Sequence, residues 1–156
     1  MRRKDREITS RSELINIIEK ADVCRIAINS DTAPYIVPLN FGYKWEEKIE
    51  IFFHCATEGR KLELLSKNNM VCFEIDIEHE LIKDEKACNW GMKYKSIIGT
   101  GKIIEINDDK EKKLALNKIM EHYGFIKENI DYNNMIFNRT KLLKLVVNEL
   151  TGKQII

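Results

Sequence analysis

The chain has 156 residues, of which 44% are hydrophobic and 33% charged, and its formal net charge is +1. The length predicts one domain over residues 1–156 that buries roughly 70% of the surface its unfolded form would expose. No apolar run approaches the ~18 residues that a membrane-spanning helix needs, and the basic residues are too dispersed to indicate nucleic-acid binding.

Residues 10–21 show the first helix pattern. Ser10 and Glu13 form an S-x-x-E capping box, in which the two side chains satisfy backbone amides at the helix start. An apolar face follows, made of Leu14, Ile15, Ile17 and Ile18. The period then changes, and residues 23–28 predict a strand that ends at the turn-forming residues 29–32.

Two further extended runs and a short helix come next. Residues 34–43 and 49–54 predict strands, and the polar residues 44–48 between them suit a hairpin connection. Residues 57–59 break the sheet pattern, and residues 60–65 begin a short helix.

The middle of the chain predicts two more strands. Residues 70–76 form one of them, whereas residues 77–90 are charged and show no clear pattern. Residues 94–106 predict a long strand. Gly99 and Gly101 within it indicate a bend or a bulge, as barrels need at their corners.

The last third of the chain combines a helix and a strand. Residues 107–109 cap a helix that runs to about Tyr123 and ends at Gly124, with an apolar face made of Ala115, Leu116, Ile119, Met120 and Tyr123. Residues 125–139 predict a loop with a short helical turn, and residues 141–150 the last strand. About six strands without strict strand–helix alternation favour a mainly antiparallel barrel with flanking helices over a doubly wound parallel sheet.

Three segments combine polar side chains with a strand or turn in a way that core packing does not require. The first is residues 35–41, where Pro38 has no amide hydrogen for a sheet neighbour and so belongs on an edge or at a bulge. Such an interrupted ladder leaves backbone groups free to meet a planar heterocycle. An ordinary edge strand is the alternative.

The second segment is residues 52–61, where a strand leads through a glycine turn into a helix. The helix start presents unpaired amide donors and a partial positive charge, and Thr57, Arg60 and Lys61 lie beside it. This combination predicts a phosphate site, although it is not a Walker loop. In the alternative, Arg60 and Lys61 are solvated residues of a first helical turn.

The third segment, residues 90–101, carries aromatic, basic and hydroxyl side chains into the glycine-bearing strand. Trp90 and Tyr94 could line a cofactor edge or serve in packing. The four cysteines include no C-x-x-C pair, and the three histidines show no H-E-x-x-H spacing. We therefore predict no metal site, and we expect a reduced, cytoplasmic protein.

In order and spacing, these segments resemble the flavin-binding split-barrel superfamily, and especially the nitroimidazole-resistance proteins and other relatives of pyridoxamine 5′-phosphate oxidase. The matching segments are residues 1–4, 35–43, 53–61, 94–102 and 150–153. The resemblance implies a six-stranded antiparallel split β-barrel and a homodimer with two FMN sites at the subunit interface, each built from both chains.

The resemblance also implies which residues contact the FMN. Val37, Pro38, Leu39 and Asn40 would run along the flavin ring; His54, Cys55 and Thr57 would approach the ring and ribityl chain; Arg60 and Lys61 would hold the phosphate; Trp90, Tyr94 and Ser96 would close the site. It implies an FMN-dependent oxidoreductase acting on a small molecule, without an assigned catalytic side chain. Resistance members tend to carry His where this chain has Arg60, so nitro-group reduction has less support than flavin binding. A non-catalytic flavin- or haem-binding module is the alternative.

Overall fold

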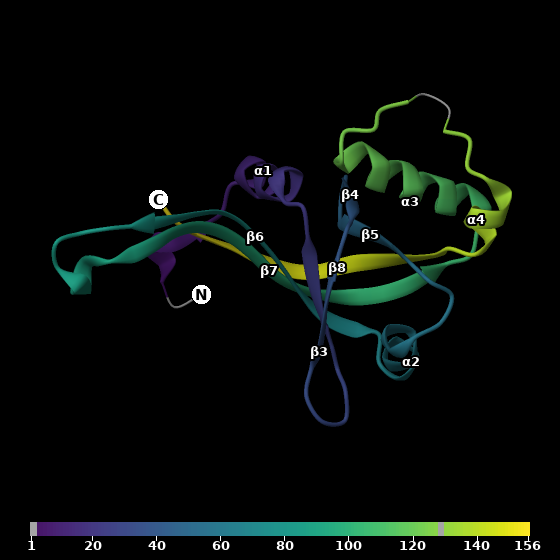
Figure 1. Cartoon of the computed structure of the whole chain (residues 1–156), viewed down its shortest axis with the longest axis horizontal. Coiled ribbons are helices and arrows are strands. Elements are labelled where there is room, and N and C mark those ends of the chain that lie inside the picture. The colour runs from purple at the N-terminus through teal and green to yellow at the C-terminus, as the bar shows by residue number, and fades with distance from the viewer. Residues whose placement is uncertain (1–2, 128–129) are drawn as a thin grey trace.

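The computed structural model describes residues 3–127 and 130–156, so Met1 and Arg2 of the N-terminal matching segment lie outside the described residues. The strands are β1 (Glu7–Ile8), β2 (Cys24–Ile28), β3 (Tyr35–Leu39), β4 (Gly42–Trp45), β5 (Ile49–Cys55), β6 (Met70–Ile82), β7 (Gly91–Ile106) and β8 (Lys141–Ile155). The helices are α1 (Arg11–Lys20), α2 (Arg60–Lys67), α3 (Asp109–His122) and α4 (Asn134–Asn138), with 3₁₀ turns at Lys4–Arg6 and Ala87–Asn89 (Figure 1).

All the strands join one antiparallel sheet in the order β3-β2-β6-β7-β8-β5-β4, and β1 pairs with β8. The two end strands of this order, β3 and β4, are joined through only Asn40 and Phe41. The sheet must therefore curl until its two edges meet at this junction. This is the arrangement of a split barrel, and it confirms the fold class predicted from the sequence.

The predicted count of six strands is wrong, because the described sheet has eight. Residues 34–43 read as one extended run, but Asn40 and Phe41 belong to neither strand and divide that run into β3 and β4. The additional strand β1 has two residues, which is too short for an alternating pattern to be visible.

The β6–β7 hairpin extends beyond the barrel as a long arm (Figure 1). It includes residues 77–82, which the sequence left unassigned. The ladder shifts register between Ile77 and Glu80, where Glu78 has a positive φ of 58°. Most side chains of β6 beyond this bulge are exposed, so they show no alternation of apolar and polar residues. This exposure hid the strand from sequence analysis.

The strand β8 runs to Ile155, further than the predicted end at residue 150, and it pairs with β7 along most of its length. The β7–β8 register shifts between Thr100 and Gly101, so an irregularity occurs where the glycines predicted a bend or a bulge, with the extra residue, Asn148, in β8. At Gly99, an added Cβ would overlap the ring of Phe73. Glycine therefore allows the ring to pack directly against the strand.

Two clusters of buried side chains hold the helices to the sheet. The larger fills the barrel interior and includes the apolar face of α1, through Leu14, Ile17 and Ile18. The smaller lies on the opposite face of the sheet under α3 and consists of Phe52, Ile106, Ala115, Ile119 and Leu142. Since β5 is covered on both faces, its residues 51–53 form a continuous apolar run rather than an alternating one.

The helix starts show the Ser10 half of the predicted capping box and the predicted cap at the start of α3. The Ser10 hydroxyl accepts a hydrogen bond from the Glu13 N–H, and the Asp108 carboxylate accepts from the amides of Lys110 and Glu111. In the part of the chain that the structure describes, no helix is long and apolar enough to cross a membrane.

Candidate functional site

The start of α2 has the geometry of an anion-binding site. Gly59 precedes it with φ 130° and ψ 167°, a conformation that is essentially restricted to glycine. The Gly59 carbonyl accepts from the amides of Leu62 and Glu63, and no side chain caps the helix. The first amides of α2 are therefore free to bind an anion beside Arg60 and Lys61.

Neither cation at the start of α2 forms an ion pair with any of the described residues. The Arg60 guanidinium instead lies over the Tyr35 ring, 4.7 Å from its centroid. Such a contact is worth about 0.5–1 kcal/mol at an exposed site. It places the first turn of α2 next to the start of β3, so two of the sequence-predicted segments do lie together.

The edge position predicted from Pro38 is confirmed, because among the described strands β3 pairs with β2 alone. Side chains alternate along this strand. Val37 and Leu39 pack against the barrel core, whereas Ile36 and Pro38 are exposed on the outer face. A ligand on the outer face would therefore meet Val37 and Leu39 through their backbone rather than their side chains.

Two predicted residues at the end of β5 point in opposite directions. Cys55 packs against the barrel core, whereas His54 is exposed on the face of β5 that carries Phe52. Burial raises the pKa of the Cys55 thiol, and nearby Lys61 only partly opposes this effect. The thiol is therefore protonated at neutral pH, which favours a packing role over a nucleophilic one. Thr57 is exposed in the loop that leads to α2.

The remaining predicted residues lie on the arm, far from α2 in the same chain (Figure 1). Trp90 is 50% exposed, and its indole N–H donates to the Asp84 carbonyl at 2.6 Å. Tyr94 and Ser96 follow along β7, opposite Ile155 and Lys153 of β8. Ile103 of β7 lies beside α2, and about 40 Å of extended strand separates it from Trp90. One chain therefore does not bring Trp90 to Arg60.

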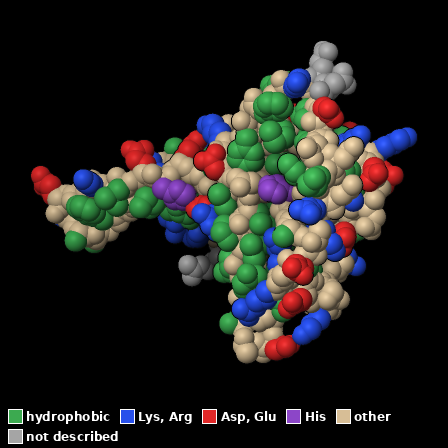
Figure 2. All heavy atoms as spheres, turned by 45° about the vertical axis from the view of Figure 1, so that its right-hand side comes forward, with side chains coloured by type: hydrophobic (Ala, Val, Ile, Leu, Met, Phe, Trp, Pro, Cys, Tyr) green, Lys and Arg blue, Asp and Glu red, His purple; other side chains and the backbone are tan. Residues whose placement is uncertain are grey.

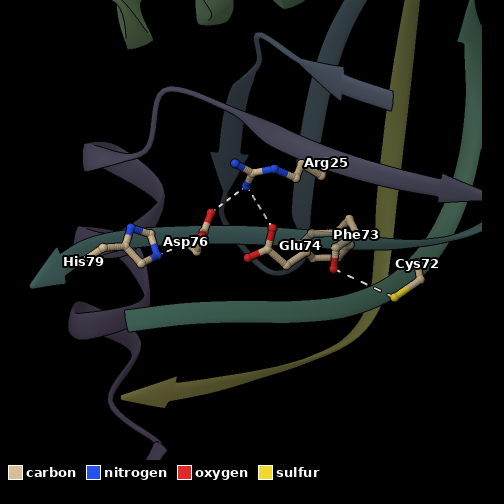
Figure 3. Close-up of polar contacts among 6 residues, drawn as sticks. All are labelled: Arg25, Cys72, Phe73, Glu74, Asp76 and His79. Carbon is tan, nitrogen blue, oxygen red and sulfur yellow. Dashed lines mark hydrogen bonds and ion pairs between the residues drawn. The ribbon is translucent and has the colours of Figure 1, made fainter. Parts of the chain in front are cut away.

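A charged cluster on the outer face lies beside the edge strand (Figure 3). Arg25, opposite Pro38 in the ladder, donates to both Glu74 and Asp76, and Asp76 also contacts His79 at 2.8 Å. Burial and the neighbouring Asp76 raise the pKa of Glu74, while Arg25 opposes them. No sequence pattern indicates this cluster, because the strand pairing that assembles it leaves no local signal.

Tyr123, directly after α3, is another residue whose role the sequence did not show. Its hydroxyl lies 2.7 Å from the Asp22 carbonyl oxygen, 3.1 Å from the Phe41 amide nitrogen and 3.1 Å from Nδ2 of Asn40. The sequence predicted only that Tyr123 shares the apolar face of its helix. In the structure it ties the end of α3 to the junction between β3 and β4.

The predicted site residues do not line the groove between α1, β4 and α3. A cavity of about 630 Å³ lies between α1, β4 and α3, and its lining includes Glu19, Tyr43, Trp45 and His122 but none of the predicted residues. Within residues 3–127 and 130–156, no group of three or more His, Cys, Asp or Glu side chains is placed to hold a metal ion.

Comparison with known proteins identifies the family. The family model described as pyridoxamine 5′-phosphate oxidase matches residues 10–154. A crystal structure of a candidate 5-nitroimidazole antibiotic resistance protein from Bacteroides thetaiotaomicron VPI-5482 is 34% identical, with a TM-score of 0.81, and the match covers 95% of this chain and 86% of that one. A search of curated proteins finds none that matches this chain.

Two more distant structures share the fold. The flavocytochrome Anf3 from Azotobacter vinelandii is 16% identical with a TM-score of 0.82, and the match covers 100% of this chain and 72% of that one. An FAD and heme binding protein from Mycobacterium smegmatis is 18% identical with a TM-score of 0.81, covering 96% and 73%. Because its family model spans almost the whole barrel and a relative shares a third of its residues, the chain belongs to the pyridoxamine 5′-phosphate oxidase family.

Proposed function

We propose that the protein is an FMN-binding oxidoreductase that acts on a small molecule. The observation that carries the proposal is the start of α2, where uncapped amides and two cations without ion-pair partners among the described residues lie beside the edge strand β3. A phosphate group would accept hydrogen bonds from these amides and satisfy both charges. The residues present therefore fit the phosphate end of FMN.

Family membership and similar proteins support flavin as the rest of the ligand. The family model carries the description pyridoxamine 5′-phosphate oxidase. Solved structures that share the fold include an FAD and heme binding protein and a flavocytochrome. When bound, the flavin supplies the electron chemistry. The chain would hold the phosphate at α2 and lay the ring against the backbone of residues 37–40, at the edge strand β3.

The proposal includes a homodimer, because the residues expected around one flavin lie at opposite ends of one chain. Trp90, Tyr94 and Ser96 would reach the α2 end of the partner chain through the arm. The arm carries exposed apolar side chains, with Leu81 46%, Trp90 50% and Met92 42% accessible, and hydrophobic side chains are visible at its far end in Figure 2. A second copy would bury this surface.

The proposed substrate class follows from the solved relative of highest identity given above. The Bacteroides relative points to nitro compounds such as 5-nitroimidazoles. Arg60 stands where resistance members tend to carry histidine, so nitroreduction requires its own assay with metronidazole as the probe.

All four cysteines are free thiols, which is compatible with a reducing location such as the cytoplasm.

The test is FMN binding by the double variant Arg60→Ala/Lys61→Ala. We expect affinity for FMN to fall by about 2–4 kcal/mol, because two charge-assisted contacts are lost, while affinity for riboflavin changes little. Lys110→Ala/Lys113→Ala is the matched control, since both lysines are exposed on α3. Equal loss for riboflavin, or unchanged FMN affinity in the α2 variant, would place the phosphate elsewhere.

A haem- or flavin-storage module is the second candidate function, favoured by the cofactors named for the two distant structures and by the exposed side chain of His54. The absorption spectrum of the purified protein separates the candidates, since haem gives an intense Soret band and flavin gives two weaker bands. Flavin that stays oxidised with every nicotinamide donor tested would favour storage over catalysis.

A further inference from the structure

The hydrogen bonds of Tyr123 fix the orientation of the Asn40 amide. A tyrosine hydroxyl has one proton to donate. The Asp22 carbonyl, at 2.7 Å, can only accept, so it receives that proton. The Phe41 N–H and the Asn40 side chain, each at 3.1 Å, must therefore both donate to the lone pairs of the hydroxyl oxygen.

Because Asn40 has to donate, its NH₂ group faces Tyr123. The same nitrogen also lies 3.5 Å from the Asp22 carbonyl, which again requires a donor. The amide oxygen Oδ1 is then left without a hydrogen-bond partner among the described residues, on a side chain that is exposed. An amide that would otherwise rotate freely is thus held as an outward-facing acceptor.

The neighbouring residue His122 makes this arrangement rigid. Its Nε2 lies 2.7 Å from the Ala21 carbonyl, which can only accept, so Nε2 carries a proton and donates. The His122 ring also packs against the Phe41 ring, with 4.3 Å between centroids. Both side chains at the end of α3 therefore fasten the loop after α1 to the β3–β4 junction, which keeps the Tyr123 hydroxyl in place.

We propose that Tyr123 is a positioning residue that sets Asn40 Oδ1 as the acceptor for the imide N–H of the flavin ring. This inference rests on the proposed function. Asn40 directly follows β3, two residues after the exposed Pro38, and its own side chain is exposed as well. The pyrimidine part of oxidised flavin has one N–H between two carbonyl groups. A fixed oxygen selects that N–H, whereas a freely rotating amide would bind a flanking carbonyl equally well.

The test compares FMN with 3-methyl-FMN, in which a methyl group replaces the imide hydrogen. We expect the full-length protein to bind FMN about tenfold more tightly than 3-methyl-FMN. The methyl group removes one hydrogen bond and also presses against an oxygen that is fixed in place. Asn40→Ala and Tyr123→Phe should each reduce this preference to about threefold or less. Tyr132→Phe is the matched control, because it removes a hydroxyl that donates to Asn117 at 2.8 Å on another part of α3.

A second readout is the ionisation of the bound flavin imide, followed by absorbance. A hydrogen bond to the protonated imide raises its pKa, so this pKa should fall in Asn40→Ala and Tyr123→Phe and stay unchanged in Tyr132→Phe. Thermal unfolding shows whether each variant folds. If Tyr123→Phe does not, Asn40→Ala decides the question, since its side chain is exposed.

The possible results separate this inference from the function on which it rests. FMN binding with a preference that disappears in the two variants supports both. FMN binding with a preference that Asn40→Ala leaves intact overturns the role of Asn40 and Tyr123 but not flavin binding. A wild-type protein that binds neither ligand overturns the proposed function and this inference together.

Discussion

Replacing Gly59 by alanine isolates the backbone conformation that begins α2. With φ 130° and ψ 167°, Gly59 lies in a region that side-chain-bearing residues rarely adopt. An added Cβ would have no atom within 4 Å, so there is no steric overlap with neighbours to consider. The cost is then backbone strain alone, about 1–3 kcal/mol. At about 2–4 °C per kcal/mol for a chain of this size, the midpoint of thermal unfolding should fall by about 2–12 °C.

Urea unfolding provides the direct measurement of this cost, with the free energy of unfolding extrapolated to water. Gly91→Ala is the control, because Gly91 has no positive φ and its nearest neighbour, Ile82, lies at an ordinary 3.6 Å. If the chain instead relaxes the strain by moving the first turn of α2, stability will be preserved but FMN affinity will fall. A Gly59→Ala protein that matches Gly91→Ala in both stability and FMN affinity would refute the reasoning.

Three other predictions concern parts of the fold away from α2. Gly42→Ala should destabilise the protein by about 1–3 kcal/mol in urea unfolding, because its Cβ would overlap the backbone of Lys118 and Ile119 in α3. Burial, together with the hydrogen bond to Glu19, raises the pKa of Tyr43 to about 12. The folded state therefore holds the Tyr43 proton more tightly than the unfolded state does. The stability that this proton contributes is lost as the pH rises from about 10 to 12. The free energy of unfolding measured against pH should show this loss in the wild type and not in Tyr43→Phe. Arg25→Gln should be more destabilising at pH 7 than at pH 4, because it removes the cation that opposes the raised pKa of Glu74 and leaves that carboxylate unpaired where it is ionised. Equal effects at the two pH values would contradict this.

The parts of the fold that were predicted correctly depend on interactions between residues close in sequence. The capping pattern at Ser10 and the acidic start of α3 were visible because each helix cap involves residues at most three apart. The irregularity opposite Gly101 was visible because glycine within a strand needs a structural reason. The arm was missed for a physical reason of the opposite kind, since residues exposed on both faces have no apolar side to mark the strand.

The distance along the chain between interacting residues also explains which parts of the site could be predicted from the sequence. The helix start at Gly59, Arg60 and Lys61 is local, so its chemistry was recognisable before its geometry was known. The Asn40–Tyr123 contact joins residues 83 positions apart, and the Arg25–Glu74 pair spans 49. The opposed directions of His54 and Cys55 follow from simple alternation, but the run of buried residues before them in β5 hid that alternation.

The two proposed contacts with FMN use different physics, and salt distinguishes them. Binding of a phosphate by Arg60 and Lys61 is an interaction between exposed charges, so it weakens as ionic strength rises and the Debye length shortens from about 10 Å at 0.1 M to about 3 Å at 1 M. The Asn40 oxygen accepts from a neutral N–H group, and such a contact is much less sensitive to screening. Added NaCl should therefore lower the affinity for FMN while leaving the ratio between FMN and 3-methyl-FMN unchanged. Riboflavin, which has the imide but no phosphate, should show little salt dependence. If salt changed the ratio as strongly as the affinity, the two ends of the ligand would not be recognised independently, and the assignment of Asn40 to the imide would fail even with the phosphate correctly placed at α2.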